Sequence, residues 1–305
     1  MTQFLALDWG TTNLRAWRLD YEGQVLAARQ FELGVSQIAR GEVEQVFIRR
    51  IRPELHAERL PTLMCGMVGS NMGWQAAPYV DCPAGSADIA SQTITVAQAP
   101  LVRIVPGLRC DGLTRAPDVM RGEETQLLGW TELQGADARG RHLVCHPGTH
   151  AKWAIMEDGR VARFVTAMTG ELFDVLTKHS VLGGAGEAED EAAFSEGIEA
   201  AGNGQALASR LFSARARVVA GGADAASTRS YLSGLLIGAE IASLPLECGA
   251  VNSNTIWLVG SASVRGRYRQ GLRRWNYEVR EMDGEEAVLA GMLALVRRGA
   301  LHDAR

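Results

Sequence analysis

Two stretches of the chain share one pattern, and this repeat constrains the fold more than any other feature. "FLALDWGTTNLRAW" begins at residue 4 and "HLVCHPGTHAKWAI" begins at residue 142. Each holds a short apolar run, a Gly-Thr pair and a second apolar run with a tryptophan. In both stretches a turn with an acid and a glycine follows, at residues 20–23 and 158–159. A third apolar run comes after each turn. The repeat predicts two similar domains, each beginning with an antiparallel meander of three strands.

The rest of the chain alternates helical and strand-like patterns, which predicts mixed β-sheets flanked by helices. Helical spacing covers residues 43–55, where Pro53 either kinks the helix or starts a new turn. Further strands are expected within "TLMCG", "NTIWLVG" and "NYEVR". Further helices are expected at 171–182, 190–201, 205–216, 229–244, 264–275 and 285–298. We expect domains at 1–122 and 123–284, with the C-terminal helix 285–305 packing back on the first.

The composition excludes several classes of protein. Hydrophobic residues make up 47% and charged residues 22%, as in an ordinary globular protein with a core. A net charge of -4 argues against a nucleic-acid or membrane-surface binder, and no run approaches the roughly 20 apolar residues of a membrane helix. The five cysteines are scattered and form no CxxC pair, which is typical of reduced thiols in a cytoplasmic protein. The sequence leaves the oligomeric state open, a homodimer included.

The Gly-Thr turns indicate a phosphate site. Backbone N–H groups and hydroxyls on a tight glycine turn form a concave anion site. The candidates are Gly10, Thr11 and Thr12 in the first turn and Gly148 and Thr149 in the second. The first turn taken alone is better explained as a plain hairpin turn, and one such turn is weak evidence; two, one in each domain, would hold a polyphosphate between the domains. No GxxxxGK[ST] loop and no GxGxxG after a strand occurs, so a nucleotide would need another binding scheme.

Asp8 precedes the first turn and is a candidate for a metal rather than for phosphate. A carboxylate does not bind a phosphate directly, but it holds a Mg²⁺ ion through water molecules, and the ion bridges phosphate oxygens. The pair His146 and His150 flanks a turn between strands, so a metal site built on these two histidines is disfavoured.

"LDWGTT", "HPGTH" and "LVGSAS" resemble, in this order, the first phosphate, second phosphate and adenosine motifs of the actin, hexokinase and heat-shock-ATPase superfamily. "DWGTTNLRAW", "GMVGSNMGW", "PYVDCPA", "VMRGEETQLLG", "PGTHAKW", "MTGEL" and "SGLLIGAEIAS" resemble more closely the 2-dehydro-3-deoxygalactonokinase family, over nearly the whole chain. The resemblance implies two ribonuclease-H-like domains with mixed sheets and an active-site cleft between them. It also implies ATP and Mg²⁺ as cofactors and 2-dehydro-3-deoxy-D-galactonate, phosphorylated at O6, as the substrate.

"RGEET" supplies the candidate catalytic base. A kinase that phosphorylates a hydroxyl needs a carboxylate close to it to accept the proton. Glu123 or Glu124 fits this role, and the other acid would then stabilise the helix N-terminus. Arg121 is a candidate for the substrate carboxylate, which a guanidinium group holds through two hydrogen bonds, or it is a solvated surface residue.

The loop "GMVGSNMGWQAAPY" is the sugar-acid loop that the resemblance implies. Ser70, Asn71, Trp74 and Tyr79 would contact the substrate hydroxyls and its C–H edges, although the two aromatic residues also fit as core anchors.

Seven further residues complete the expected site. His150 and Lys152 are expected to contact phosphate or the substrate carboxylate. Glu171 is either a partner for Lys152 or a helix cap. Two pairs are left to the resemblance: Asn13 and Arg15 on the substrate side, and Gly260 with Ser261 on the nucleotide side.

Three other functions remain as alternatives. The first is a kinase for a related sugar acid such as 2-dehydro-3-deoxygluconate, because one inverted hydroxyl is distinguished by one or two hydrogen bonds. The second is a phosphohydrolase of the same fold, which the aromatic residues of the sugar-acid loop disfavour. The third is a ligand-sensing regulator, disfavoured because no DNA-binding helix pair is attached and both candidate acids are present.

Overall fold

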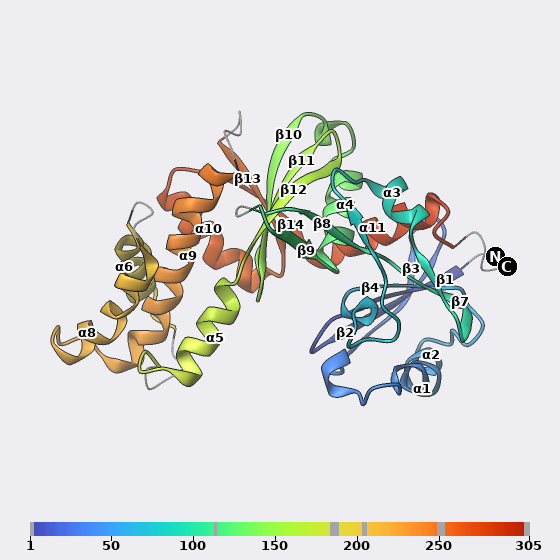
Figure 1. Cartoon of the computed structure of the whole chain (residues 1–305), viewed down its shortest axis with the longest axis horizontal. Helices are drawn as coiled ribbons and strands as arrows, with labels where there is room; N and C mark the ends of the chain where they lie inside the picture. Colours follow the sequence, from blue (N-terminus) through green and yellow to red (C-terminus); the bar gives the residue numbers. More distant parts are fainter. Residues whose placement is uncertain (1–2, 113–114, 184–188, 203–205, 249–253, 302–305) are drawn as a thin grey trace. The chain divides into compact units, whose positions relative to one another are not determined.

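The computed structural model describes residues 3–112, 115–183, 189–202, 206–248 and 254–301 (Figure 1). The chain divides into two compact units. Unit 1 holds Met1–Gly140, Met156–Arg163 and Gly284–Arg305, and unit 2 holds Arg141–Ile155 and Phe164–Asp283. The expected domain boundary after residue 122 falls inside unit 1, and the expected domain ranges stay predictions.

Unit 1 is built on a six-stranded sheet with the order β3-β2-β1-β4-β7-β6. Its central strand β1 pairs antiparallel with β2 and parallel with β4. The predicted meander is confirmed, because β1, β2 and β3 occupy the three expected runs. The strands are β1 Gln3–Trp9, β2 Leu14–Asp20, β3 Val25–Phe31, β4 Thr62–Cys65, β6 Ile94–Val96 and β7 Ala99–Ile104.

A second, three-stranded sheet in unit 1 has the order β5-β8-β9. Its strands are β5 Tyr79–Asp81, β8 Gly107–Asp111 and β9 Pro117–Met120. The sequence did not predict these strands, because each is only three to five residues long. Only Arg121 and Gly122 separate the end of β9 from Glu123, the first residue of helix α4. This sheet therefore positions the acidic start of α4.

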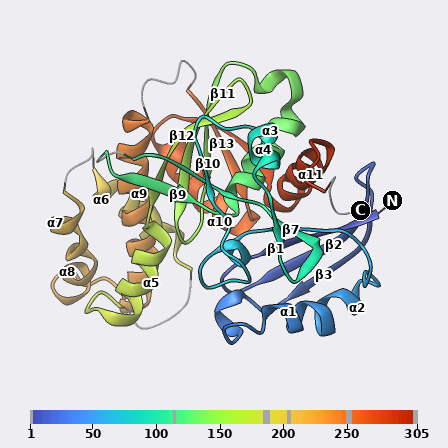
Figure 2. The same ribbon diagram turned by 45° about the vertical axis from the view of Figure 1, so that its right-hand side comes forward.

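Helices α4 and α11 of unit 1 pack together (Figure 2). They are α4 Glu123–Gln134 and α11 Gly284–Arg297. Glycine permits the close approach, since a Cβ on Gly129 would lie 1.7 Å from the Ala287 carbonyl oxygen and one on Gly291 would lie 1.9 Å from that of Thr125.

The helix expected at 43–55 consists of three short pieces: α1 Val43–Val46, a π-helical turn at Phe47–Ile51 and α2 Arg52–Glu54. Pro53 lies in the first turn of α2, so it starts a new turn, where its missing N–H costs nothing. The other helical elements of unit 1 are the 3₁₀ turns at Val35–Gln37, Met67–Gly69 and Gly135–Ala138, and α3 Ser86–Ser91.

Unit 2 repeats the strand order of unit 1. Its five-stranded sheet has the order β12-β11-β10-β13-β14, so a three-strand meander again pairs through its first strand with a later strand. Strand β10 runs parallel to β13, and β13 runs parallel to β14. The predicted repeat of the meander is confirmed. The strands are β10 Arg141–His146, β11 Ala151–Glu157, β12 Arg160–Ala167, β13 Thr255–Gly260 and β14 Glu278–Asp283.

The helices of unit 2 largely follow the expected ranges. They are α5 Thr169–His179, α6 Glu191–Ala201, α7 Leu207–Leu211, α8 Ser213–Val219, a 3₁₀ turn at Ala225–Ser227, α9 Thr228–Glu247 and α10 Ala262–Arg274. The single helix expected at 205–216 is two short helices, and its expected first residue lies outside the described residues. In the described part of the chain, every helix is too short or too polar to cross a membrane.

The crossing of α6 and α9 depends on glycine and gives a test of the fold. A Cβ on Gly234 would lie 2.0 Å from the Phe194 carbonyl oxygen, which forces the helices apart. We expect Gly234→Ala to lower the free energy of unfolding by roughly 1–3 kcal/mol, as overpacked cores do. The measurement is the urea midpoint of the purified protein.

Gly266→Ala is the matched control, because this glycine also lies inside a helix of unit 2 but its Cβ would meet only Arg269 Nη2 at 3.9 Å. Its better helix propensity should leave the midpoint unchanged or raise it. Equal losses in the two variants would contradict the packing argument.

Candidate active site

The carboxyl ends of β1 and β4 bring two candidate acids of unit 1 to the same place. Asp8 on β1 lies opposite Cys65 on β4 in the parallel register. The Cys65 thiol lies 3.8 Å from Asp8 Oδ1. Burial raises the pKa of this thiol well above its usual value, and the nearby charges of Asp8 and Glu124 raise it further. The end of β1 and the start of α4 therefore meet at a protonated cysteine.

Asp8 forms an ion pair with Arg15 across the hairpin, with Arg15 Nη2 2.6 Å from Asp8 Oδ2. Burial opposes the charge of Arg15, but the Asp8 carboxylate outweighs it, so the pKa of Arg15 is raised. Arg15 thus neutralises Asp8, and its expected role on the substrate side stays a prediction.

The first Gly-Thr turn presents polar groups to solvent. The Gly10 N–H donates to the Asn13 carbonyl oxygen at 2.9 Å, which closes the turn, and Thr11, Thr12 and Asn13 are exposed. The backbone of Gly34 packs directly against the turn, since a Cβ on Gly34 would lie only 1.9 Å from the Thr11 carbonyl oxygen. The turn is therefore held rigidly by backbone contacts while its hydroxyls stay available to an anion.

The two acids at the start of α4 differ in burial. Glu124 is fully buried, and its Oε2 accepts a hydrogen bond from the Gly122 N–H at 2.6 Å. Glu123 is half-buried and accepts from the Arg121 N–H at 3.2 Å. Burial first, and then the charge of Glu123, raise the pKa of Glu124 to about 8. At neutral pH Glu124 therefore carries a proton, and Glu123 is the acid of this pair that solvent reaches.

Arg121 lies at the end of β9 with part of its guanidinium group unsatisfied. Its Nη2 donates to the Ala77 carbonyl oxygen at 2.8 Å, and the group lies 4.4 Å from the centre of the Tyr79 ring. Its Nε and Nη1 atoms are buried without a hydrogen-bond partner among the described residues. A buried guanidinium group with free donors is costly unless an anion completes it, so the site fits a carboxylate.

The sugar-acid loop places its four candidates differently. Ser70 Oγ donates to the Met67 carbonyl oxygen at 2.7 Å, and Asn71 is exposed. Trp74 packs against Phe47 with ring centres 5.5 Å apart and against the core of unit 1. Tyr79 is 38% exposed beside Arg121. The structure supports the core-anchor interpretation for Trp74, whereas Tyr79 remains open to a ligand.

The second Gly-Thr turn, in unit 2, is braced by the start of α5. A Cβ on Gly170 would lie 2.6 Å from the Gly148 carbonyl oxygen, and the Glu171 N–H donates to the Thr149 carbonyl oxygen at 3.0 Å. His150 Nε2 contacts Glu171 Oε2. A Cβ on Gly148 itself would meet no atom of the described chain within 4 Å, so this side of the turn is open.

Lys152 is buried beneath this turn rather than exposed on it. Only 3% of its surface is exposed, and its Nζ donates to the His150 carbonyl oxygen at 2.8 Å. The structure thus pairs Glu171 with the His150 ring, and it uses Lys152 to hold the backbone of the turn. Any contact of Lys152 with phosphate stays a prediction.

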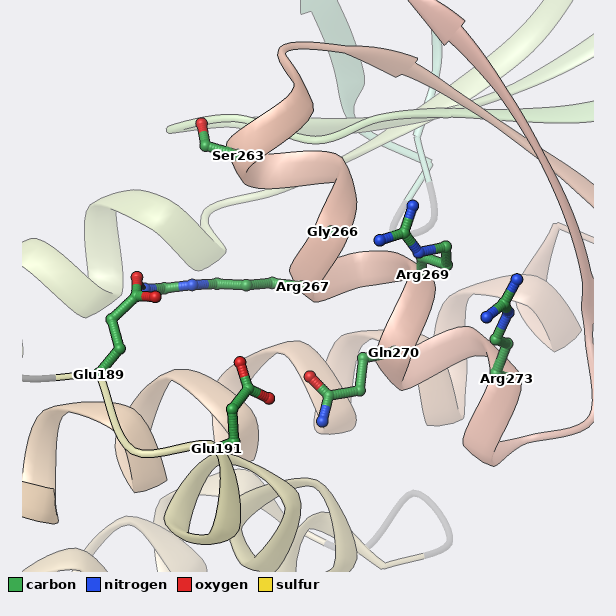
Figure 3. A pocket seen from close by; sticks show the side chains of 8 residues that line it. All are labelled: Glu189, Glu191, Ser263, Gly266, Arg267, Arg269, Gln270 and Arg273. Atoms are coloured by element: carbon green, nitrogen blue, oxygen red, sulfur yellow. Dashed lines mark hydrogen bonds and ion pairs between the residues drawn. The ribbon is translucent and has the colours of Figure 1, made fainter.

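The adenosine motif ends β13 and opens α10. Gly260 has a φ of 151°, a backbone conformation that favours glycine, and Ser261 is the N-cap residue of α10. Beside α10 lies a cavity of about 510 Å³ (Figure 3). Arg267 crosses it to Glu189, with Nη2 2.7 Å from Oε1. The cavity is lined by Glu189, Glu191, Ser263, Gly266, Arg267, Arg269, Gln270 and Arg273. The sequence did not predict these lining residues, although the polar face of the helix after "LVGSAS" could have indicated them.

A buried carboxyl group on α9 ties unit 2 together. Glu240 on α9 accepts from Trp153 Nε1 at 2.6 Å and from the Tyr268 hydroxyl at 2.8 Å, and Thr169 also bonds to it. Burial raises the pKa of Glu240 against these hydrogen bonds. The network connects the second turn's hairpin, the start of α5 and α10, so it fixes their spacing.

The residues around Asp8 fit a Mg²⁺ ion that is held by one carboxylate, with water molecules and substrate phosphates as its other ligands. The described residues contain no cluster of three or more His, Cys, Asp and Glu side chains, so they offer no all-protein metal site. Cys65 is protonated and Arg15 occupies one carboxylate oxygen. A single carboxylate beside a phosphate turn suits Mg²⁺, which keeps several waters and uses substrate phosphates as ligands.

Sheets of matching strand order, each with a Gly-Thr turn after its central strand, define an α/β protein of the actin and hexokinase fold class. The family model for 2-keto-3-deoxy-galactonokinase matches residues 8–295. The chain belongs to this family.

Individual relatives match over nearly their whole length. A Rhizobium meliloti (strain 1021) protein assigned as 2-dehydro-3-deoxygalactonokinase is 40% identical over 301 residues, 96% of each chain. The Escherichia coli (strain K12) 2-dehydro-3-deoxygalactonokinase is 37% identical over 296 residues, 96% of this chain and 97% of the relative. A Sinorhizobium meliloti crystal structure assigned to the same enzyme superposes with a TM-score of 0.85 at 39% identity, covering 96% of this chain and 98% of that one.

The raised pKa of Glu124 predicts a pH dependence of stability. Between about pH 4.5 and about 8 the folded chain keeps a proton that the unfolded chain loses. This group therefore makes stability fall as pH rises, by up to about 1.4 kcal/mol per pH unit, until the folded state also ionises. Glu124→Gln should remove this slope and exceed the wild type in stability above about pH 8. Urea midpoints across this range measure it.

Glu123→Gln is the matched control, because the neighbouring side chain is half-exposed and should leave most of the slope in place. If Glu124→Gln keeps the slope of the wild type, Glu124 ionises normally and the burial argument is wrong.

Proposed function

We propose that this protein transfers the γ-phosphate of ATP to the 6-hydroxyl of 2-dehydro-3-deoxy-D-galactonate, giving the 6-phosphate and ADP. The observation that carries the proposal is the acid pair at the start of α4, one acid accessible and the other buried, beside Asp8 and its phosphate-type turn. The names of the relatives, at 37–40% identity over nearly the whole chain, support the substrate.

Unit 1 would supply the groups for the sugar acid. Glu123 is the acid of the pair within reach of a ligand, so it would accept the proton of the 6-hydroxyl as the phosphoryl group arrives. Arg121 would hold the substrate carboxylate through its unsatisfied donors, with Tyr79 against the sugar chain. Ser70, Asn71, Asn13 and Arg15 would contact hydroxyls, and Trp74 would support the loop.

Unit 2 would supply the groups for the nucleotide. The open Gly148 turn and Thr149 would bind phosphate oxygens, with His150 beside them and Lys152 holding the backbone. Gly260, Ser261 and the cavity along α10 would take the adenosine. Transfer then requires the two sets of residues to meet around one ATP molecule and to exclude water.

Mg²⁺ would be held by Asp8 through water, next to Gly10, Thr11 and Thr12. Bound there, the ion would neutralise charge on the β- and γ-phosphates. All five cysteines are free thiols, which supports a reducing compartment, the cytoplasm, as the place of the reaction.

A panel of sugar acids tests the substrate. We expect ADP release that depends on 2-dehydro-3-deoxy-D-galactonate and a kcat/KM at least about tenfold lower for the gluconate epimer, since one inverted hydroxyl costs at least one hydrogen bond. A coupled assay of ADP release measures both. Equal or better turnover of the epimer would favour the related-acid kinase, and ADP release at the same rate without any acid would favour the phosphohydrolase.

Removing the proposed base, Glu123, should lower kcat. We expect Glu123→Gln to lower kcat about 10²–10⁴-fold with a small change in KM for the sugar acid, because the amide cannot accept the proton. Steady-state kinetics at saturating ATP measure this effect. Glu132→Gln is the control, as this acid lies exposed near the far end of the same helix.

Glu124→Gln decides between the two acids. A greater loss of kcat in Glu124→Gln than in Glu123→Gln would move the role of base to Glu124, and full activity of both variants would remove it from this helix.

A further inference from the structure

Two cysteines face each other across the small sheet of unit 1. Strands β5 and β8 pair in parallel with Asp81 opposite Arg109. The Cys82 N–H donates to the Arg109 carbonyl oxygen at 2.9 Å, so Cys82 lies opposite Cys110, the next residue of β8. Neighbouring strands lie about 4.8 Å apart, which is inside the range of roughly 4.4–6.8 Å between Cα atoms that a disulfide spans.

The two thiols already touch. Cys82 and Cys110 are hydrogen-bonded through their side chains. This bond, followed by burial, raises the pKa of Cys82. Both side chains are half-buried, whereas Cys65, Cys145 and Cys248 are fully buried. Solvent therefore reaches this pair and not the other three thiols.

The end of strand β5 can shift by the small distance that a disulfide between Cys82 and Cys110 requires. Strand β5 is three residues long and lies at the edge of its sheet. Pro83 follows Cys82 and offers no N–H to continue the ladder. The exposed ion pair of Asp81 with Arg109 holds the two strands in register next to the thiols. The sulfur atoms are thus aligned by the backbone while the end of β5 keeps some freedom.

We propose that Cys82 and Cys110 form a reactive dithiol that exchanges with small disulfides and closes to an intramolecular disulfide. In the first step the thiolate of one of the two cysteines attacks a small disulfide such as glutathione disulfide, forming a mixed disulfide and releasing one small thiol. The other cysteine, having lost its proton to solvent, then attacks the sulfur atom of the first and releases the second small thiol. The pair gives up two electrons, and the small disulfide accepts them.

The bond would fix the strand that carries Tyr79 to β8. Tyr79 begins β5 and stacks on Arg121, so oxidation would tether one wall of the proposed sugar-acid site. A reducing cytoplasm would keep the dithiol open, and an oxidising challenge would close it reversibly. The modification itself depends only on the two thiols and holds whether or not the protein is the proposed kinase.

Thiol exchange on the native protein tests the proposal. The full chain is incubated with glutathione disulfide, quenched with an alkylating reagent and analysed by mass spectrometry before and after digestion. We expect the wild type to lose two alkylatable thiols and to yield a Cys82–Cys110 linked peptide, with no glutathione retained. The three buried cysteines, alkylated only after unfolding, are the internal control.

Single variants provide the matched comparison. In Cys82→Ser and in Cys110→Ser the second step is impossible, so we expect each variant to stop at a stable mixed disulfide with one glutathione and to yield no linked peptide. Addition of a reductant should return the wild type to full thiol content. Wild-type protein that stays reduced in redox buffers that oxidise free dithiothreitol, or that retains glutathione on both cysteines, would overturn the proposal.

Discussion

The change of strand direction at the central strand of each sheet is the constraint on which the rest of the structure depends. Strand β1 has an antiparallel hairpin partner on one side and a parallel neighbour on the other, and β10 likewise follows a meander order and pairs parallel with β13. At such a point the chains leave the sheet in different directions, so the carboxyl end of the central strand is left uncovered. Both Gly-Thr turns lie there, and so do Asp8 and the Cys65 contact with the start of α4.

In both units, a hydrogen bond from a buried indole on the second strand of the meander helps to hold these turns in place. Trp17 of β2 donates to Glu285 of α11 at 3.1 Å, and Trp153 of β11 donates to Glu240 of α9 at 2.6 Å. In each unit the indole anchors the second strand of the meander to a glutamate on a helix far along the chain. Because an unpaired buried indole or carboxyl group is costly, each contact fixes the helix against the hairpin that carries the turn.

The sequence predicted the features that have a local cause. The repeated meander and its turns are encoded in runs of a few residues, since turn chemistry and alternation act over short distances. Strands β5, β8 and β9 were not predicted, because runs of three to five residues are too short to show an apolar period. The hydrogen-bond network of Glu240 was not predicted either, because a single acid in an apolar helix does not show which side chains pack over it. The cavity along α10 was not predicted either, because Glu189 and Glu191, which line its other side, lie far earlier in the chain.

The choice between Glu123 and Glu124 shows where local information ends. Two adjacent acids at a helix start are chemically equivalent in the sequence, and both fit the dipole. Packing separates them: a Cβ on Gly122 would lie 3.2 Å from Gly66 Cα, so α4 begins hard against the end of β4 and buries only the second acid. The charge of Glu123 then adds to burial in keeping Glu124 protonated. A neutral neighbour leaves one carboxylate at the helix start, so a single proton acceptor faces solvent there instead of two that repel each other.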